Sequence, residues 1–166
     1  GPIATGPDAE EIDRLLSELA KPDQPGWRQI EDAIALEWSK SGSAAMDLLL
    51  QRGRAALEEG EVDTALEHLR ALTDHAPDFA EGWNTRATAY FRAERYGLAM
   101  QDISRALALE PRHFGAMIGL ATILREVGRE EEALAVLRRV HELHPHRPNV
   151  TEGIARLSQQ LDGESL

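Results

Sequence analysis

Three histidines near the C-terminal end of the chain have the side chains and the spacing for metal chemistry. His141 and His144 share one face of a helix, and His146 follows Pro145. Imidazole nitrogens are common zinc ligands, so this cluster could chelate one divalent cation. Histidines near a helix C-terminus are, however, also favoured by its free carbonyl groups, and the chain has no cysteine to complete a site. We therefore expect no resident metal or cofactor, and weak divalent-metal binding is kept as an alternative.

The chain lacks the sequence motifs of common catalytic sites. It contains no phosphate-binding loop, no H-E-x-x-H helix and no G-x-S-x-G turn. Its acidic runs, 58–61 and 130–132, fall where helices are expected to start or end. Acidic side chains are favourable near helix N-termini, which explains most of them without general acid–base chemistry. The sequence therefore predicts a protein that is not an enzyme.

Length and composition restrict the class of protein further. The 166 residues are 42% hydrophobic, 28% charged and 5% aromatic, which is typical of one folded domain. A net charge of -11 argues against binding to nucleic acid. No apolar run approaches the roughly 20 residues of a membrane-spanning helix, so we expect no membrane insertion. The first residues, Gly1 and Pro2, are typical of a cleaved tag, and we expect residues 1–7 to be disordered.

The elements that must position any site follow a repeat of 34 residues. Small residues recur at this spacing in two columns, a third column is proline, and bulky apolar residues lie between them. The columns are Gly53, Ala87 and Ala121; Ala65, Ala99 and Ala133; and Pro77, Pro111 and Pro145. Small residues allow two helices to cross closely, and proline lies where a helix should stop. Each repeat is therefore predicted to be an antiparallel pair of helices.

Turn and cap residues support these helix boundaries. Gly60 and Gly128 lie between the paired helices of the first and third repeats, where the second repeat has Glu94 instead. A turn there must form without the freedom of glycine at positive φ, so it is predicted to be the weakest turn. Asp78 and Glu81 have the spacing of a capping box at the start of the second repeat.

With these columns the chain resembles a tetratricopeptide repeat protein. The family pattern is best matched by Trp83, Ala87, Tyr90, Ala99, Ile103, Ala106 and Pro111; the aromatic positions are Leu49 and Ala56 in the first repeat and Met117 and Leu124 in the third. The resemblance implies an all-α fold, a right-handed α-solenoid of three helix pairs over residues 46–147. The repeats are expected at 46–79, 80–113 and 114–147.

Two flanking segments are predicted to cap the array, because a solenoid cannot bury its terminal faces alone. Residues 8–43 should form a helical hairpin packed on the first repeat. Residues 148–161 should form a capping helix with Asn149 as its N-cap, followed by a frayed tail at 162–166. Segments near Trp38 and Phe114 are similar to small alphaproteobacterial tetratricopeptide proteins, many of which carry a signal peptide. That similarity implies a periplasmic location, with the cytoplasm as the alternative.

The family resemblance also implies a concave groove that receives a protein or peptide partner. The corresponding groove residues are Leu50, Arg54, Leu57, Asn84, Thr88, Phe91, Arg92, Ile118, Thr122, Arg125 and Arg156. Phe91 is the expected anchor, because aromatic side chains dominate binding energies when they enter a pocket. The alternative interpretation is that Leu50, Leu57 and Ile118 belong to the core. The predicted function is an interaction scaffold, either monomeric or weakly self-associating, with a self-assembling structural protein as the second possibility.

One type of partner is not supported by the residues present. Family members that clamp the C-terminal tails of Hsp70 and Hsp90 use Lys, Asn, Asn, Lys and Arg at set groove positions. The matching positions here are Leu50, Arg54, Thr85, Gly115 and Gly119. Only Arg54 is cationic, so that function is not expected.

Overall fold

The computed structural model describes residues 4–164. In this part of the chain there are nine α-helices and no β-strand. They are α1 (Ala9–Leu19), α2 (Trp27–Trp38), α3 (Ala44–Glu58), α4 (Val62–His75), α5 (Ala80–Arg92), α6 (Tyr96–Leu109), α7 (Phe114–Glu126), α8 (Glu130–Leu143) and α9 (Pro148–Glu164). None of these described helices is long and apolar enough to cross a membrane. Residues 1–3 of the segment 1–7 that was predicted to be disordered, and residues 165–166 of the predicted tail 162–166, lie outside the described residues.

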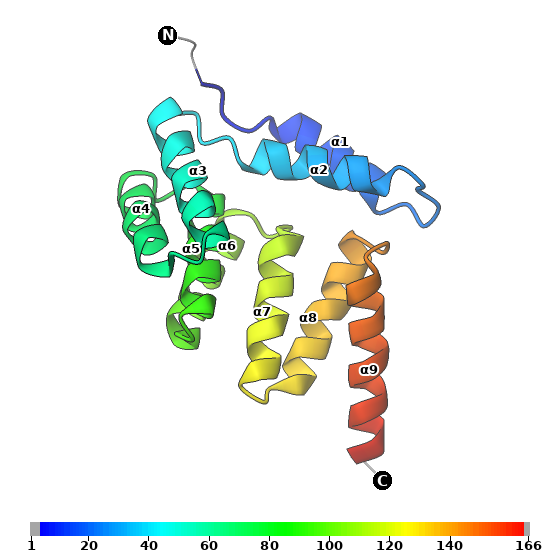
Figure 1. Ribbon diagram of the computed structural model, residues 1–166. Helices are drawn as coiled ribbons and strands as arrows, with labels where there is room; N and C mark the ends of the chain where they lie inside the picture. The colour runs from blue at the N-terminus through cyan, green and yellow to red at the C-terminus, as the bar shows by residue number, and fades with distance from the viewer. Residues whose placement is uncertain (1–3, 165–166) are drawn as a thin grey trace.

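The helices α3 to α8 form three antiparallel pairs that stack side by side (Figure 1). Each helix packs most closely on its partner in the pair, and contacts of α4 with α5 and of α6 with α7 join successive pairs, so the predicted all-α solenoid is confirmed. The small residues are buried where the paired helices cross. At Gly53 an added Cβ would lie 2.6 Å from Cδ2 of Leu69, which shows why the first crossing requires glycine.

A buried ion pair fixes the middle of the array. The guanidinium of Arg86 on α5 donates two hydrogen bonds to the carboxylate of Asp102 on α6, at 2.7 and 2.9 Å. A third, at 3.0 Å, reaches the hydroxyl of Thr73 on α4. A charge-assisted bidentate pair is directional, so it fixes the orientation of α4, α5 and α6 relative to one another.

The helix ends agree with the sequence in most places. α4, α6 and α8 each end two residues before their proline. Glu94 adopts φ 59°, in the left-handed region occupied by Gly60 and Gly128. α3 begins at Ala44 rather than at residue 46, and α9 continues to Glu164, beyond the expected end at 161. Asn149 lies inside α9, which begins at Pro148, so its predicted role as N-cap is wrong.

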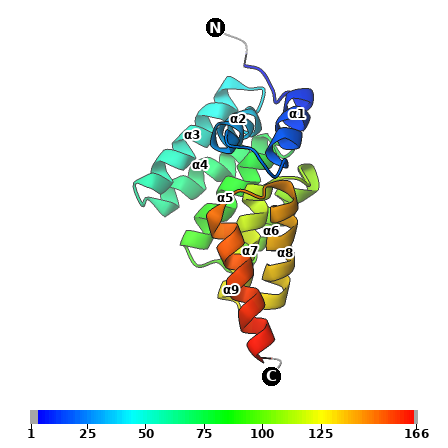
Figure 2. The same ribbon diagram turned by 90° about the vertical axis from the view of Figure 1, so that its right-hand side faces the viewer.

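The N-terminal hairpin α1–α2 packs on the third repeat, so the prediction that it packs on the first repeat is wrong. It runs across the upper end of the stack in Figure 1, above the start of α7 and the end of α8, and Figure 2 shows it from the side. Its buried apolar residues share one cluster with α7, α8 and α9. The hairpin contributes Ile12, Leu15, Leu16, Leu19, Ile34 and Trp38, and the third repeat contributes Phe114, Met117, Leu124, Leu134, Leu137 and Val140.

The physical reason is that the third repeat offers both apolar and polar partners to the hairpin. The rings of Trp38 and Phe114 lie 5.2 Å apart, centroid to centroid. In the third repeat, Nε2 of His144 lies 2.5 Å from a carboxylate oxygen of Glu31 on α2, and an ion pair of 2.8 Å joins Asp13 on α1 to Arg112 at the end of the second repeat. The first repeat instead buries its own apolar residues in a separate cluster with Phe79 and Ala89. The hairpin therefore folds back over the array and covers the ends of its helices.

Candidate functional site

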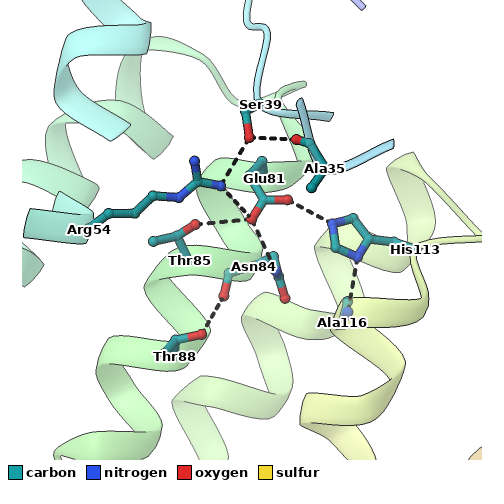
Figure 3. Close-up of polar contacts among 9 residues, drawn as sticks. All are labelled: Ala35, Ser39, Arg54, Glu81, Asn84, Thr85, Thr88, His113 and Ala116. Carbon is teal, nitrogen blue, oxygen red and sulfur yellow. Dashed lines mark hydrogen bonds and ion pairs between the residues drawn. The ribbon is translucent and has the colours of Figure 1, made fainter. Parts of the chain in front are cut away.

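A buried carboxylate, Glu81, is the centre of a polar network at the start of α5 (Figure 3). Its Oε1 accepts hydrogen bonds from Asn84 at 3.2 Å and from Thr85 at 3.3 Å. Its Oε2 lies 2.8 Å from Nε2 of His113. Arg54 on α3 completes the set, with Nη2 3.2 Å from Oε1. Four polar partners from three segments thus compensate for the burial of one charge.

The backbone fixes the protonation state of this network. Nδ1 of His113 accepts a hydrogen bond of 2.9 Å from the N–H of Ala116. The N–H of this ring is therefore at Nε2, which donates a hydrogen bond to the carboxylate of Glu81. Burial by itself would raise the pKa of Glu81. The hydrogen bond from His113 and the positive charge of Arg54 outweigh burial, and the pKa is lowered. Glu81 is therefore an ionised carboxylate that accepts from neutral and charged donors.

Helix α2 extends the network over the concave side. Arg54 donates to the hydroxyl of Ser39 at 3.1 Å, and Ser39 donates to the carbonyl of Ala35 at 2.7 Å (Figure 3). The indole of Trp38 stacks on the ring of His113, with centroids 4.3 Å apart. The network therefore joins α2, α3, α5 and the start of α7 at one end of the concave face.

The capping box predicted from Asp78 and Glu81 is not formed. The N-cap of α5 is Phe79, which makes no side-chain hydrogen bond, and Glu81 turns towards His113 instead. His113 is itself the N-cap of α7. Sequence reasoning missed this pair because the two residues occupy different repeat positions. The available signal was a histidine immediately before a helix, where a side-chain acceptor is expected.

An apolar hollow of about 230 Å³ lies between α5 and α7, next to this network. Its lining consists of Asn84, Ala87, Thr88, Phe91, Ile103, Gly115, Gly119, Thr122 and Ile123. Two glycines, one turn apart on α7, belong to this lining. A Cβ added at Gly119 would lie 3.6 Å from Cδ1 of Ile103, an ordinary contact distance, whereas one at Gly115 would lie 3.1 Å from Cε1 of His113.

Four of the predicted groove residues meet at this hollow: Asn84, Thr88, Phe91 and Thr122. Phe91, the expected anchor, is half-buried, and its ring packs at 5.5 Å against Tyr96. Gly115 and Gly119 were considered only as positions of the chaperone-tail clamp and not as contact residues of the groove. A glycine pair at helical spacing facing an aromatic residue was the signal that could have identified the hollow.

Two predicted groove residues are buried in the core instead. Leu50 and Leu57 lie in the cluster of the first repeat, whereas Ile118 is only partly buried and packs against the cluster of the third repeat. The alternative interpretation as core therefore holds for Leu50 and Leu57. Their large apolar groups are covered by neighbouring helices, because first helices in adjacent repeats also face one another.

The four predicted arginines have different surroundings. Arg54 belongs to the Glu81 network, and Arg92 donates to the carbonyl of Leu57, which ties α5 to α3. Arg125 is exposed beside a shallow pocket that shares Thr122 with the hollow. Arg156 is exposed on α9.

The histidines considered for metal binding instead dock the hairpin. His144 is fully buried, with Nε2 2.5 Å from a carboxylate oxygen of Glu31 on α2. His146 donates to the carbonyl of Leu19 at 2.9 Å, and His141 is exposed. Among residues 4–164 no group of three or more histidine, aspartate or glutamate side chains is arranged to hold a metal ion.

Comparison with protein families and sequences gives consistent matches. Two family models described as Tetratricopeptide repeat match residues 90–157 and 50–108. A TPR repeat-containing protein of Rhizobium etli is 36% identical over 161 residues, which is 96% of this chain and 79% of that protein. RNA polymerase II-associated protein 3 of Homo sapiens is 26% identical over 152 residues. That match covers 91% of this chain and 23% of the human protein.

A solved structure gives a similar result. The first TPR of Spaghetti (RPAP3), bound to an HSP90 peptide with the sequence SRMEEVD, superimposes with a TM-score of 0.69 at 27% identity. The superposition covers 72% of this chain and 95% of that one.

Proposed function

Because this chain belongs to the tetratricopeptide repeat family, we propose that it is a non-enzymatic adaptor that binds a peptide or partner helix. The proposed binding surface is the concave groove, and within it the hollow between α5 and α7. The structurally similar TPR of Spaghetti was solved with a peptide bound, which supports a peptide partner here.

The observation that carries this proposal is the apolar hollow itself. Its volume of about 230 Å³ is large enough to admit one large apolar side chain, and Phe91 is half-buried at its edge. Ligand pockets are typically concave and mostly apolar, with a few polar groups that fix orientation. Here Asn84, Thr88 and Thr122 provide those polar groups. A partner would gain most affinity by burying one apolar side chain in the hollow.

The partner is not expected to be a chaperone tail held by a five-residue clamp. Gly115 and Gly119, at two of the cationic clamp positions, form part of the hollow. Leu50, at a third, is buried. At the positions where a clamp would bind a carboxylate, the hollow therefore favours an apolar side chain of the partner.

Filling the hollow tests the proposal. A random peptide display library is selected against the wild-type protein, and the enriched peptides are assayed against Gly119→Phe. The new ring should occupy the hollow without disturbing the core, because only Ile103 lies near the Cβ position. We expect binding of the enriched peptides to fall at least about tenfold.

The matched control is Gly97→Phe, which makes the same change in α6 where nothing lies within 4 Å of an added Cβ. It should leave peptide binding unchanged. The proposal fails if Gly119→Phe, folded by circular dichroism, binds the same peptides as tightly as the wild type does.

Export to the periplasm is also proposed, on the similarity to secreted alphaproteobacterial repeat proteins. Fractionation of cells that express the native gene tests it, and recovery in the cytoplasmic fraction would contradict it.

A further inference from the structure

Within the described residues, one side of α3 has no helix packed along it. The hairpin that was predicted to cap this end of the array packs on the third repeat, and α3 packs on α4 and α5. We call the uncovered side the outer face of α3. Its exposed residues recur at helical spacing and are Ala45, Leu48, Arg52 and Ala55. The concave groove is not part of this face.

The 34-residue period shows how the same face behaves in the other repeats. The residues equivalent to Leu48 are Gly82, Ala116 and Val150, and those equivalent to Ala55 are Ala89, Ile123 and Leu157. All six are buried. In the first repeat, by contrast, 44% of Leu48 is exposed, and Ala55 is exposed as well. The outer face of α3 is therefore a stacking face that lacks its cover.

The other repeats also show what kind of element provides the cover. The second helix of each pair packs on the first helix of the next, α4 on α5, α6 on α7 and α8 on α9. An added Cβ at Gly82 would lie 3.2 Å from Cγ of Leu72 on α4, and one at Gly153 would lie 3.2 Å from Cδ1 of Leu137 on α8. Consecutive helices alternate in direction (Figure 1). The missing cover is therefore an antiparallel helix.

A second copy of this chain can supply such a helix only through α3 itself. The stacking faces of α4, α6 and α8 are already packed on the next helix. The opposite end of the array, α9, presents mainly polar side chains to solvent, among them Glu152, Arg156, Gln159 and Asp162. A two-fold axis brings the same patch of two copies together, and when it is perpendicular to a helix it places the two helices antiparallel. Pairing of α3 with α3 thus meets the requirement.

We propose that two copies of the chain associate weakly through the outer faces of their α3 helices. Each α3 provides the antiparallel helix that the other lacks. The small side chains of Ala45 and Ala55 allow a close approach, and both copies of Leu48 are removed from water. The outer face is centred near the middle of α3, so Glu58 and Glu59 of one copy lie near the N-terminus of the other α3. An acidic side chain is favourable there.

The association is expected to be weak for two reasons. One helix face buries less than the roughly 800 Å² per partner of a standard stable interface. Each copy also has a net charge of -11, and its repulsion is only partly screened at physiological salt, where screening acts over about 8 Å. We therefore expect a dissociation constant of the dimer between about 10 μM and 1 mM.

Sedimentation equilibrium across this concentration range tests the proposal. The wild-type mass should rise with concentration from 18.3 kDa towards twice that value. Leu48→Glu places a like charge on both sides of the contact and should raise the dissociation constant at least about tenfold. Because the position is exposed, circular dichroism should show an unchanged fold. The matched control is Val127→Glu at the end of α7, which adds the same charge where the exposed fraction is also 44% and should leave the dissociation constant unchanged.

Cross-linking then locates the contact. The sequence contains no cysteine, so a single introduced thiol reports on one position. Arg52→Cys, in the middle of the outer face, should give covalent dimers with a short bismaleimide, and Val127→Cys at the same concentration should not. Equal cross-linking of the two variants would contradict the assigned surface.

Three results of sedimentation would overturn the proposal. They are a wild type that stays monomeric up to about 1 mM, a mass that rises beyond two chains, as head-to-tail assembly would give, and a Val127→Glu variant that weakens association as much as Leu48→Glu does. These measurements involve no peptide. The proposed function therefore stands or falls separately, on peptide binding to Gly119→Phe.

Discussion

At the scale of single residues, His113 performs three tasks with one ring. Its Nδ1 caps the start of α7, its Nε2 donates to Glu81, and its face stacks on Trp38. Each contact fixes the ring for the other two, and only 3% of the residue is exposed. Few side chains combine an acceptor, a donor and an aromatic face in this geometry.

Replacing His113 should therefore be costly. His113→Ala removes a cap, a hydrogen bond to a charged group and a ring contact, so the free energy of unfolding should fall by about 3 kcal/mol. Urea denaturation monitored by circular dichroism measures it. His141→Ala, at an exposed position, should change stability by less than about 0.5 kcal/mol. Equal effects of the two substitutions would contradict the assigned role of His113.

His144 makes stability depend on pH. Burial lowers its pKa, and this outweighs the nearby Glu31 carboxylate, while Arg147 and His146 act in the same direction as burial. Because Nε2 faces Glu31, a second proton would go to Nδ1, which is buried without a partner among the described residues. The unfolded chain binds that proton near pH 6.5, and the folded protein does so only in more acidic solution.

The stability contributed by His144 is thus complete above about pH 6.5 and is lost as the pH falls towards its lower folded-state pKa. We expect the free energy of unfolding to decrease by up to about 1.4 kcal/mol per pH unit in this range. His144→Gln should flatten that dependence, and His141→Gln should not. A dependence as steep in His144→Gln as in the wild type would assign the effect to another group. The contribution of Glu81, whose pKa is also lowered, persists down to about pH 4.3 and is lost only below that value.

At the scale of elements, glycine has opposite roles on α3 and α7. Gly53 is required for the close approach of α4, since its missing Cβ would lie 2.6 Å from Leu69. Gly119 faces the open hollow and has no such restriction. The same residue type therefore marks a packed crossing in one repeat and an empty groove in another.

A pair of alanine substitutions distinguishes these roles. Gly119→Ala should raise the free energy of unfolding by about 0.5–1 kcal/mol, because alanine favours a helix interior over glycine. Gly53→Ala should lower it by about 1–3 kcal/mol, because the added methyl overpacks the crossing. Thermal and urea denaturation of both variants test the contrast. A destabilised Gly119→Ala would show that the hollow is tighter than the distances indicate.

The turn between α5 and α6 retains strain that glycine would remove. Glu94 has φ 59°, a conformation that costs a residue with a Cβ roughly 1 kcal/mol. Glu94→Gly should therefore stabilise the protein by a few tenths of a kcal/mol to about 1 kcal/mol, after the greater entropy of glycine in the unfolded chain is included. The melting temperature measures it, and Glu59→Gly, at an ordinary helical φ, should destabilise. A loss of stability in Glu94→Gly would show that the side chain contributes more than its backbone costs.

At the scale of the whole molecule, the hairpin changes a linear array into a folded-back one. In a simple solenoid each repeat contacts only its neighbours. Here α1 and α2, which precede the first repeat in sequence, share a core with the third. The hairpin crosses the ends of α7 and α8 (Figure 1), and Ser39 at the end of α2 also accepts a hydrogen bond from Arg54 of the first repeat.

This arrangement predicts that the hairpin and the third repeat lose stability together. Leu15→Ala, at a buried position in α1, should cost about 2–4 kcal/mol. Hydrogen exchange measured by mass spectrometry should show the larger loss of protection in α7 and α8, with α4 much less affected. Leu66→Ala in α4, which packs against the cluster of the first repeat, provides the opposite control. Greater loss in α3 and α4 than in α7 after Leu15→Ala would contradict the shared core.

The sequence by itself determined the local and periodic features of this protein. Helix pairs, crossings and turns depend on residues close in the chain or on columns 34 residues apart, such as Gly53 with Leu69 or the conformation at Glu94. Asn84, Thr88, Phe91 and Thr122, which were predicted to share a surface, line one hollow, because residues in equivalent repeat positions face the same way.

Only the tertiary structure decided the contacts between residues that the 34-residue repeat does not relate. No periodicity relates Glu31 to His144 or Trp38 to His113, so neither the docking of the hairpin nor the contacts of His144 and His146 with it were predictable from spacing. Leu50 and Leu57 were predicted to lie in the groove because the repeat position of a residue indicates which way its side chain points. It does not indicate how far neighbouring helices bury that side chain. Burial depends on the whole surroundings of a side chain, and those are complete only when distant segments of the chain have packed together.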